Sequence, residues 1–313
     1  MVGKMIEIFD KMKISVALCT YNGELFLKDQ LESIFKQTRL PDEIIVCDDC
    51  STDSMVEILN NFQKIFPVSF KIYVNEKNLG VSKNFEKAIS LCSGDIIQDD
   101  VWMPEKIEKI IKVFTRNKDC SYVFSDAYIV NKDLHPLGYT MWNGISFDRL
   151  QRKKFIKGIQ LEVVLKHNVV TGATMAFRSS LREVILPIPA IWIHDAWIAL
   201  LGSMLGRGYF VERPLIYYRQ HDYQLIGGKK LGVSDKVRKA LSTDVTDYIL
   251  EIKRYEVFNS RVLNLLGRNN NKVEDKILFL KERIKIYESS VFLSLIIITY
   301  ELFSGRYLSM QMG

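Results

Sequence analysis

The sequence lacks both glycine signatures through which many chains bind nucleotide phosphates by their backbone amides. Neither Gly-x-Gly-x-x-Gly nor Gly-x-x-x-x-Gly-Lys follows its first apolar segment, which argues against a dinucleotide-binding Rossmann domain and against a P-loop. A phosphate group bound by this chain would therefore need side chains or a cation to meet its charge.

Long apolar runs and a disulfide framework are also missing. The longest apolar stretch, 291–300, is far shorter than the ~20 residues of a transmembrane helix. Residues 1–13 mix Lys, Glu and Asp and contain no apolar core of a secretory signal, so we expect a cytoplasmic protein. The five cysteines are odd in number and scattered, and the one Cys-x-x-Cys, at 47–50, lacks the two further ligands of a zinc site.

The charge balance is moderately basic. Lys and Arg number 43 against 37 Asp and Glu, giving a net charge of +6 and a pI near 8.9. This favours anionic ligands or an acidic membrane surface without demanding nucleic acid, for which no signature is present. The 313 residues suffice for one large α/β domain with an extension, or for two domains.

Short apolar segments alternate with helical patterns along the first 126 residues. Strands are predicted at 14–19, 43–47, 69–74, 95–97 and 122–124, and helices at 25–35, 54–65, 81–91 and 104–114. Buried strands separated by helices indicate right-handed crossovers and a mainly parallel sheet covered on both faces. Ligands of such sheets bind at the carboxyl ends of the strands.

Three polar clusters directly follow predicted strands: 20–23, Asp48-Asp49 and Asp99-Asp100. Adjacent carboxylates repel unless a cation neutralises them, so Asp99-Asp100 fits a divalent-cation site and a solvated turn equally well. Asp49 can accept hydrogen bonds from a ribose hydroxyl or a pyrimidine N–H, and Tyr21 offers a ring for stacking. A nucleoside diphosphate matches these groups.

Several motifs in order resemble the family 2 glycosyltransferases with the GT-A fold. They are Cys-Thr-Tyr-Asn-Gly (19–23), Asp-Asp-Cys-Ser-Thr-Asp (48–53), Asn-Leu-Gly-Val-Ser-Lys-Asn-Phe (78–85), Gly-Asp-Ile-Ile (94–97) and Gln-Asp-Asp-Val-Trp-Met-Pro-Glu (98–105). Thr171-Gly172, His-Asp-Ala-Trp (194–197) and Tyr-Arg-Gln-His (218–221) resemble its bacterial rhamnosyltransferase-like branch. The resemblance spans about residues 13–228.

The resemblance implies an α/β fold of GT-A type, with a Rossmann-like, mainly parallel sheet flanked by helices. We expect a transferase domain at 1–228, with a nucleotide-binding half (13–126) and an acceptor-binding half (127–228), and a mostly helical extension at 229–313. The implied activity is inverting transfer of a sugar, with rhamnose as a candidate, from a UDP- or dTDP-sugar to a saccharide or lipid-linked acceptor. It would serve bacterial surface polysaccharide synthesis at the inner face of the membrane, and self-association into a homo-oligomer is a further expectation.

The resemblance also implies roles for individual residues. Asp195 would be the catalytic base, and Asp99 with His221 would hold Mg²⁺ or Mn²⁺. The nucleotide-binding residues would be Thr20, Tyr21, Asn22, Asp48, Asp49, Asn78, Gly80 and Asn84. Donor or acceptor would be bound by Asp100, Trp102, Thr171, Gly172, His194, Trp197 and Arg219.

Simpler interpretations exist for several of these residues. Asp195 stands where a helix begins and could be only its N-cap, although His194 and Trp197 beside it favour the base. His221 could be an ordinary surface residue, with Arg219 nearby raising the odds of diphosphate binding. The segments 229–239 and 283–307 could lie on an anionic membrane or pack as core helices, and packing is slightly favoured.

One departure from the family pattern stands out. Gln98 follows Ile97 directly, so the acidic strand is about four residues short and an earlier aspartate is missing. A loss of that length would retract Asp99 by up to ~13 Å. The alternative function is therefore a catalytically impaired relative that binds a nucleotide sugar or a partner. A nucleotidyltransferase is disfavoured because residues 19–25 contain no Gly-rich basic loop.

Overall fold

The computed structural model describes residues 12–98, 101–220 and 244–288. The chain divides into two compact units, one formed by 1–148 with 170–228 and the other by 149–169 with 229–313. The expected transferase domain 1–228 thus differs from the first unit by the segment 149–169, whose helices pack with those of the C-terminal region.

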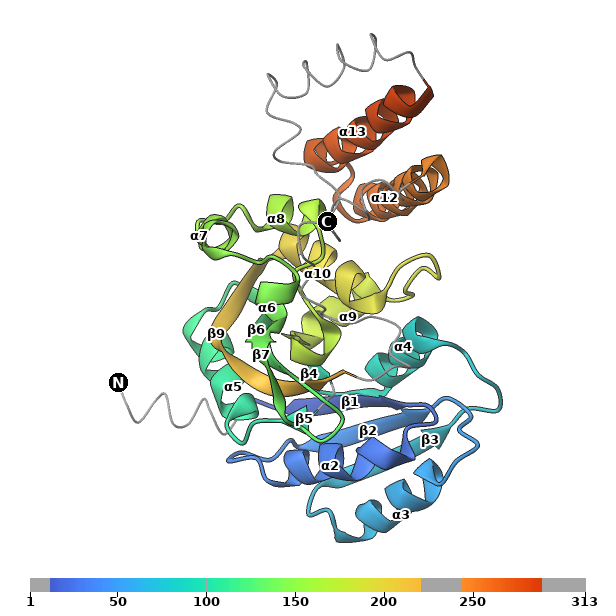
Figure 1. Ribbon diagram of the computed structural model, residues 1–313, viewed down its shortest axis with the longest axis vertical. Coiled ribbons are helices and arrows are strands. Elements are labelled where there is room, and N and C mark those ends of the chain that lie inside the picture. The colour runs from blue at the N-terminus through green and yellow to red at the C-terminus, as the bar shows by residue number, and fades with distance from the viewer. Residues whose placement is uncertain (1–11, 99–100, 221–243, 289–313) are drawn as a thin grey trace. The chain divides into compact units, whose positions relative to one another are not determined.

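The first half of the first unit is a parallel sheet with crossover helices, as predicted (Figure 1). Strands β1 (Ile14–Thr20), β2 (Glu43–Asp48), β3 (Ser69–Val74) and β4 (Asp95–Gln98) lie in the order β3-β2-β1-β4. The connecting helices are α2 (Glu24–Phe35), α3 (Met55–Ile65) and α4 (Val81–Leu91). The register sets Thr20 beside Asp48, so the polar strand ends meet at one edge.

Alternation along the strands explains this layering. Ile14, Val16 and Leu18 of β1 join the core cluster that also contains apolar residues of α2, α3 and α5 (Lys106–Arg116). Residues between them in sequence face the other side, where α4 packs against β1 and β2. Both faces of β1 and β2 are therefore shielded from water, which accounts for their near-continuous apolar composition.

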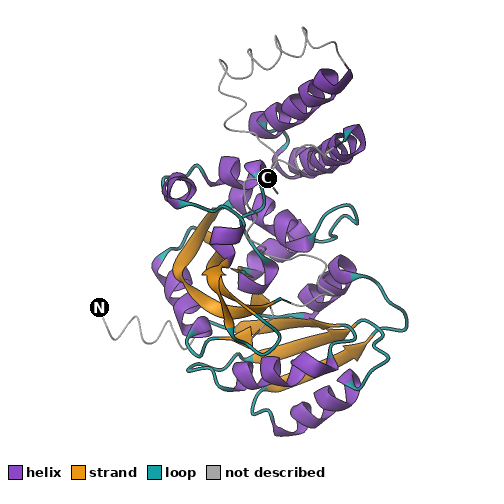
Figure 2. Cartoon of the chain, in the orientation of Figure 1, coloured by secondary structure: helices purple, strands orange, loops and turns teal. Residues whose placement is uncertain are grey.

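The second half of the unit extends the same sheet with mixed pairing (Figure 2). Strand β6 (Cys120–Val130) is much longer than the predicted 122–124, and it pairs parallel with β9 (Arg207–Arg219). The short strands β5 (Val101–Trp102), β7 (Pro136–Thr140) and β8 (Ala176–Phe177) pair antiparallel to their neighbours. Helices α6 (Met141–Gly144), α9 (Arg182–Ile185) and α10 (His194–Leu205) complete this half.

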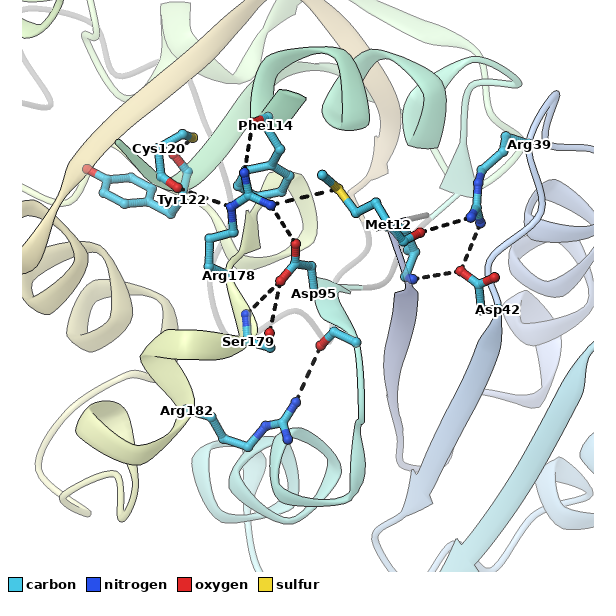
Figure 3. Close-up of polar contacts among 12 residues, drawn as sticks. Met12, Arg39, Asp42, Asp95, Phe114, Cys120, Tyr122, Arg178, Ser179 and Arg182 are labelled. Atoms are coloured by element: carbon cyan, nitrogen blue, oxygen red, sulfur yellow. Dashed lines mark hydrogen bonds and ion pairs between the residues drawn. The ribbon is translucent and has the colours of Figure 1, made fainter. Parts of the chain in front are cut away.

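An ion pair joins the two halves at the start of β4 (Figure 3). Arg178 Nη1 donates to Asp95 Oδ2 at 2.8 Å, while its Nη2 donates to the carbonyl of Phe114 at 2.7 Å. Ser179 N donates to the other carboxylate oxygen at 2.8 Å. Because Asp95 lies opposite Ile14 in the sheet, these bonds fix where β4 begins relative to β1.

The second unit is helical. Its described elements are α7 (Arg149–Ile156), α8 (Gln160–Lys166), α12 (Val245–Leu266) and α13 (Asn271–Glu288). Tyr255 Oη of α12 donates to the carbonyl of Leu165, which joins α8 to the C-terminal hairpin. Across the described parts of both units, no helix has the combination of length and apolar character that crossing a bilayer requires.

Candidate functional site

Asp48 organises the loop that follows β2. Its side chain is fully buried and accepts hydrogen bonds from Thr20 Oγ1 (2.8 Å), Ser51 Oγ (2.6 Å) and Ser51 N (2.8 Å). With its oxygens satisfied inside the protein, Asp48 holds the end of β1 against the loop after β2. Its geometry suits support of the expected nucleotide site better than direct contact with a ligand.

Asn22 locks the loop after β1 against the same segment. Its backbone has a φ of 45°, a left-handed conformation that Asn tolerates better than most residues. Its side-chain oxygen accepts from Thr52 N at 2.9 Å, and its N–H donates to Ser51 Oγ at 3.0 Å. The neighbouring Tyr21 stays 55% exposed, so its ring remains available for stacking.

Asp49 presents a buried carboxylate that the next loop encloses. Asn75 Nδ2 and Leu79 N donate to its Oδ1 at 2.8 and 2.7 Å, and Gly80 N donates to its Oδ2 at 2.9 Å. Gly80 has a φ of +79°, which favours glycine there. Three of the about four lone-pair directions of this carboxylate are thus occupied and the residue is 3% exposed, so its direct contact with a ligand stays a prediction.

A buried network of side-chain amides supports Asp49 from the protein interior. Asn75 Nδ2 also donates to Asn84 Oδ1 at 2.9 Å, and Asn84 Nδ2 donates to the carbonyl of Cys47 at 2.8 Å. Lys87 Nζ completes the network with a 2.7 Å bond to Asn75 Oδ1. Asn84 was predicted to bind the nucleotide but is 2% exposed with both polar atoms engaged, so it is better assigned a supporting role.

Asn75 was missed in the sequence, although a usable signal existed. It directly follows β3, the one predicted strand between 14 and 97 for which we considered no strand-end residue. Asn78, which was predicted, accepts from Gly80 N at 2.9 Å and stays exposed.

Gln98, the last residue described before the gap at 99–100, lies beside Ala17, three residues before Thr20 at the end of β1. The shortness of the acidic strand therefore stays a prediction from the sequence. Asp99 and Asp100 lie outside the described residues, and so does His221.

Trp102 is the second residue of β5 and is buried. Its backbone N–H donates to Ser33 Oγ of α2 at 2.9 Å, and its ring contacts the Lys106 ammonium, 4.2 Å from the ring centroid. A side chain only 3% exposed cannot offer its ring to a sugar in this conformation. We therefore reassign Trp102 from ligand binding to packing.

Asp195 lies in the first turn of α10 and faces another loop. Its Oδ2 accepts from Gly172 N at 2.9 Å, and its Oδ1 accepts from Ala196 N at 2.5 Å. The N-cap residue of this helix is Ile193, so the simpler interpretation of Asp195 as N-cap is not what the structure contains. At 8% exposure, the carboxylate is nearly buried at the positive end of a helix.

The residues beside Asp195 pack rather than protrude. The His194 ring stacks on Phe85 of α4, with ring centroids 4.0 Å apart, and among the described residues neither imidazole nitrogen has a hydrogen-bond partner. Burial lowers the pKa of His194, opposed by the nearby Asp195, so the ring is neutral at pH 7. Trp197 is fully buried and its indole N–H donates to the carbonyl of Ile185. Both predicted ligand contacts are therefore revised to packing roles.

Gly172 and Thr171 are placed by a single helical turn, η1 (Gly172–Thr174). Thr174 N and Oγ1 both donate to the Thr171 carbonyl, at 2.9 and 2.8 Å, which closes the turn. This conformation aims the Gly172 N–H at Asp195. This turn therefore contacts the start of α10 through the bond between the Gly172 N–H and the Asp195 side chain.

Lys106, which was missed, is fully buried behind this turn. Its Nζ donates to the carbonyl of Ala173 at 2.8 Å while contacting the Trp102 ring. The helix dipole disfavours a cation at the first residue of α5, so this ammonium needs compensating interactions of the kind that Ala173 and Trp102 provide. The sequence could have indicated its burial through helical spacing, because residues 106, 110 and 114 share one buried face of α5.

Arg219 closes the site region from β9. Its Nη2 donates to Asp29 Oδ2 at 2.6 Å, and its guanidinium stacks over Phe26 at 4.6 Å, both residues belonging to α2. The predicted donor-binding arginine thus contacts the helix that follows Tyr21 and Asn22.

The described residues do not by themselves form a metal site. No group of three or more His, Cys, Asp or Glu side chains converges on one point within 12–98, 101–220 and 244–288. The expected ligands Asp99 and His221 fall in the gaps between those ranges.

Comparison with known sequences gives consistent matches. The family described as Glycosyl transferase family 2 matches residues 15–185. The dTDP-rhamnosyl transferase RfbG of Shigella flexneri is 26% identical over 226 residues, covering 67% of this chain and 73% of its own. An uncharacterized glycosyltransferase of Nostoc sp. is 27% identical over 222 residues, 67% of this chain and 65% of its own. The chain spans 65% of that relative and 59% of an uncharacterized Mycobacterium tuberculosis protein.

Comparison with solved structures supports the fold. The S. aureus TarS 1–349 structure in complex with UDP has a TM-score of 0.55 and 17% sequence identity, covering 85% of this chain and 70% of that one. At this identity the likeness concerns the fold, and it confirms the predicted α/β architecture of GT-A type, with its parallel-rich sheet, flanking helices and helical C-terminal region.

Proposed function

The chain belongs to glycosyl transferase family 2, and we propose on that premise that it transfers a sugar from a nucleoside-diphosphate donor to a hydroxyl acceptor, with inversion. The observation that carries the proposal is the Asp195 carboxylate, held at a helix N-terminus by the Gly172 N–H in the same unit as the polar strand ends. A positioned carboxylate is what a single-displacement transfer requires of its base.

The nucleotide would bind at the ends of β1 and β2. Tyr21 would stack on the base, and Asp49 would accept from a base N–H or a ribose hydroxyl through its remaining acceptor direction. Thr20, Asn22, Asn78 and Gly80 would shape the loops around it. Asp48, Asn75 and Asn84 would support these groups from the interior.

The reaction would be one displacement at the anomeric carbon. The acceptor oxygen forms its bond to that carbon while the bond to the diphosphate breaks, and the electron pair leaves with the diphosphate. Asp195 takes the proton of the attacking hydroxyl. A divalent cation, Mg²⁺ or Mn²⁺ at Asp99 and His221, would neutralise the leaving diphosphate when bound.

The finer assignments follow the relatives' names. RfbG is named as a dTDP-rhamnosyl transferase, and TuaG of Bacillus subtilis, 30% identical over 131 residues that make up 41% of this chain and 51% of its own, is named as a putative teichuronic acid biosynthesis glycosyltransferase. We therefore favour a dTDP- or UDP-sugar donor, with rhamnose as the first candidate, and a saccharide or lipid-linked acceptor. Bacterial surface polysaccharide synthesis at the inner face of the membrane is the corresponding setting.

A second candidate is a relative that binds nucleotide sugar without turnover. The sequence favours it, because Gln98 follows Ile97 directly and the earlier aspartate of the family pattern is missing before the expected metal ligand Asp99. Calorimetry with UDP, dTDP and GDP, with and without Mn²⁺, combined with assays of donor hydrolysis and transfer, separates the two. Metal-enhanced binding with turnover supports the transferase, whereas binding without turnover supports the second candidate.

A further inference from the structure

Helix α7 forms a basic, partly apolar surface in the second unit. Residues 149–157 contain five Lys and Arg and no Asp or Glu. The helix ends at Ile156, and Gly158, with a φ of +86°, follows it. The N–H of Gly158 donates to the Phe155 carbonyl, and the N–H of Ile159 donates to the Lys154 carbonyl. This capping produces a short, defined helix instead of an irregular basic loop.

The two sides of α7 differ sharply. Phe155 is 1% exposed and anchors the inner side, whereas Leu150 is 71% and Ile156 59% exposed. At 100° per residue, Lys153 lies midway between these two on the outer side, with Arg149 beside it. The outer side, here called the α7 face, consists of Arg149, Leu150, Lys153, Ile156 and Lys157, all exposed.

The composition of the α7 face indicates which class of partner it binds: a protein, a nucleic acid or a lipid bilayer. Protein interfaces are depleted in Lys, and sites for single-stranded nucleic acid use exposed aromatic rings, which this face lacks. Aliphatic side chains interspersed with Lys and Arg fit the boundary of an anionic bilayer, where the chains insert and the cations meet lipid phosphates. We propose that the α7 face binds the surface of a membrane containing anionic phospholipid.

This proposal rests on the proposed function, because it says how the enzyme would reach a membrane-borne acceptor. The surface itself lies on α7 and not at the proposed nucleotide site. Nucleotide binding and turnover of a soluble acceptor involve the first unit, so they should be insensitive to changes on the α7 face. The two conclusions can therefore fail separately.

Flotation of the full chain with lipid vesicles tests the α7 face. We expect binding to phosphatidylcholine vesicles that contain about one third phosphatidylglycerol, at least tenfold weaker binding to pure phosphatidylcholine, and marked weakening at high salt. The variants Leu150→Ser/Ile156→Ser and Lys153→Glu/Lys157→Glu should each lower the affinity about tenfold or more. The control Lys28→Glu/Lys36→Glu makes the same charge change on exposed residues of α2 and should stay within about twofold of wild type.

Three results would overturn the proposal: no binding of the wild-type chain to anionic vesicles, equal loss of binding in the α2 control, or full binding by both α7 variants. Binding to heparin without binding to vesicles would also contradict it, since it would indicate a general polyanion surface. Calorimetry with UDP and dTDP on the same variants should be unchanged, which shows that they are folded.

Discussion

Gly172 N lies 2.9 Å from Asp195 Oδ2, so a backbone amide of the η1 turn holds a carboxylate in the first turn of α10. The two residues are 23 positions apart in the chain, and Gly172 itself is fixed by the η1 turn. Ala196 N donates to the other carboxylate oxygen, so backbone amides from two segments orient the proposed base.

Lys106 should affect turnover more than nucleotide binding. Replacing it with Met removes the bond to Ala173 and loosens the turn that carries Gly172, so kcat should fall about tenfold or more while the Kd for UDP or dTDP changes less than about twofold. Steady-state kinetics and calorimetry measure the two. Lys106→Arg should restore part of kcat, and Lys109→Met, on the same helix, should resemble wild type. An equal loss of nucleotide affinity would contradict this assignment.

Asn75→Ala should weaken nucleotide binding through Asp49. The change removes one of the three donors to Asp49 and the Asn75 donor to Asn84 Oδ1, which costs about 1–3 kcal/mol of unfolding free energy. The nucleotide Kd should rise by about tenfold, because Asp49 Oδ1 is then held by Leu79 N alone of the two donors it has now. Denaturant unfolding and calorimetry measure both quantities. Asn61→Ala, on the exposed face of α3, is the control and should alter neither.

His194 should make the protein sensitive to mild acid. Its folded-state pKa is lowered by burial, so below pH 6.5 the unfolded chain binds a proton that the folded chain does not. The unfolding free energy should therefore fall as pH drops below 6.5, and above that pH the contribution should be constant. The difference between wild type and His194→Phe, measured by denaturant titration, isolates this group. A difference independent of pH from 7 to 5 would refute the explanation.

The shortened acidic motif, in which Gln98 follows Ile97 directly, predicts unusual metal behaviour. If the strand's shortness displaces the expected cation ligands, Mn²⁺ should raise UDP or dTDP affinity by less than about tenfold, and EDTA should reduce any turnover without abolishing nucleotide binding. Calorimetry with and without Mn²⁺ measures the enhancement. Strict dependence of nucleotide binding on Mn²⁺ would show instead that the neighbouring chain compensates fully.

The regular half of the fold was readable from sequence because its signals are local. Buried strands such as 14–19 and 43–47 and the amphipathic helices between them carry clear periodicity, and their polar ends follow directly. Strands of two residues, such as Val101–Trp102, contain no period to detect. The membership of 149–169 in the second unit depends on long-range packing, as in the bond from Tyr255 to Leu165.

Site roles were harder to predict because the sequence does not show where a side chain points. Motif position placed Trp197, Asn84 and Asp48 at the ligand, but each is buried with its polar atoms bonded inside the protein. Asp195 and Gly172 were both identified, although their direct bond could not be foreseen. The sequence did indicate that Lys106 is unusual, because a lysine on the apolar face of a helix is buried and its ammonium then needs a hydrogen-bond acceptor.

The Asp195→Asn variant tests the central claim most directly. Asn keeps the shape and can still accept from Gly172 N, but it cannot take a proton. Transfer from the nucleotide sugar that the wild type uses should fall by about 10²- to 10⁴-fold, with UDP or dTDP binding by calorimetry unchanged within about twofold. A transfer rate equal to that of wild type would contradict the assignment of Asp195 as the base.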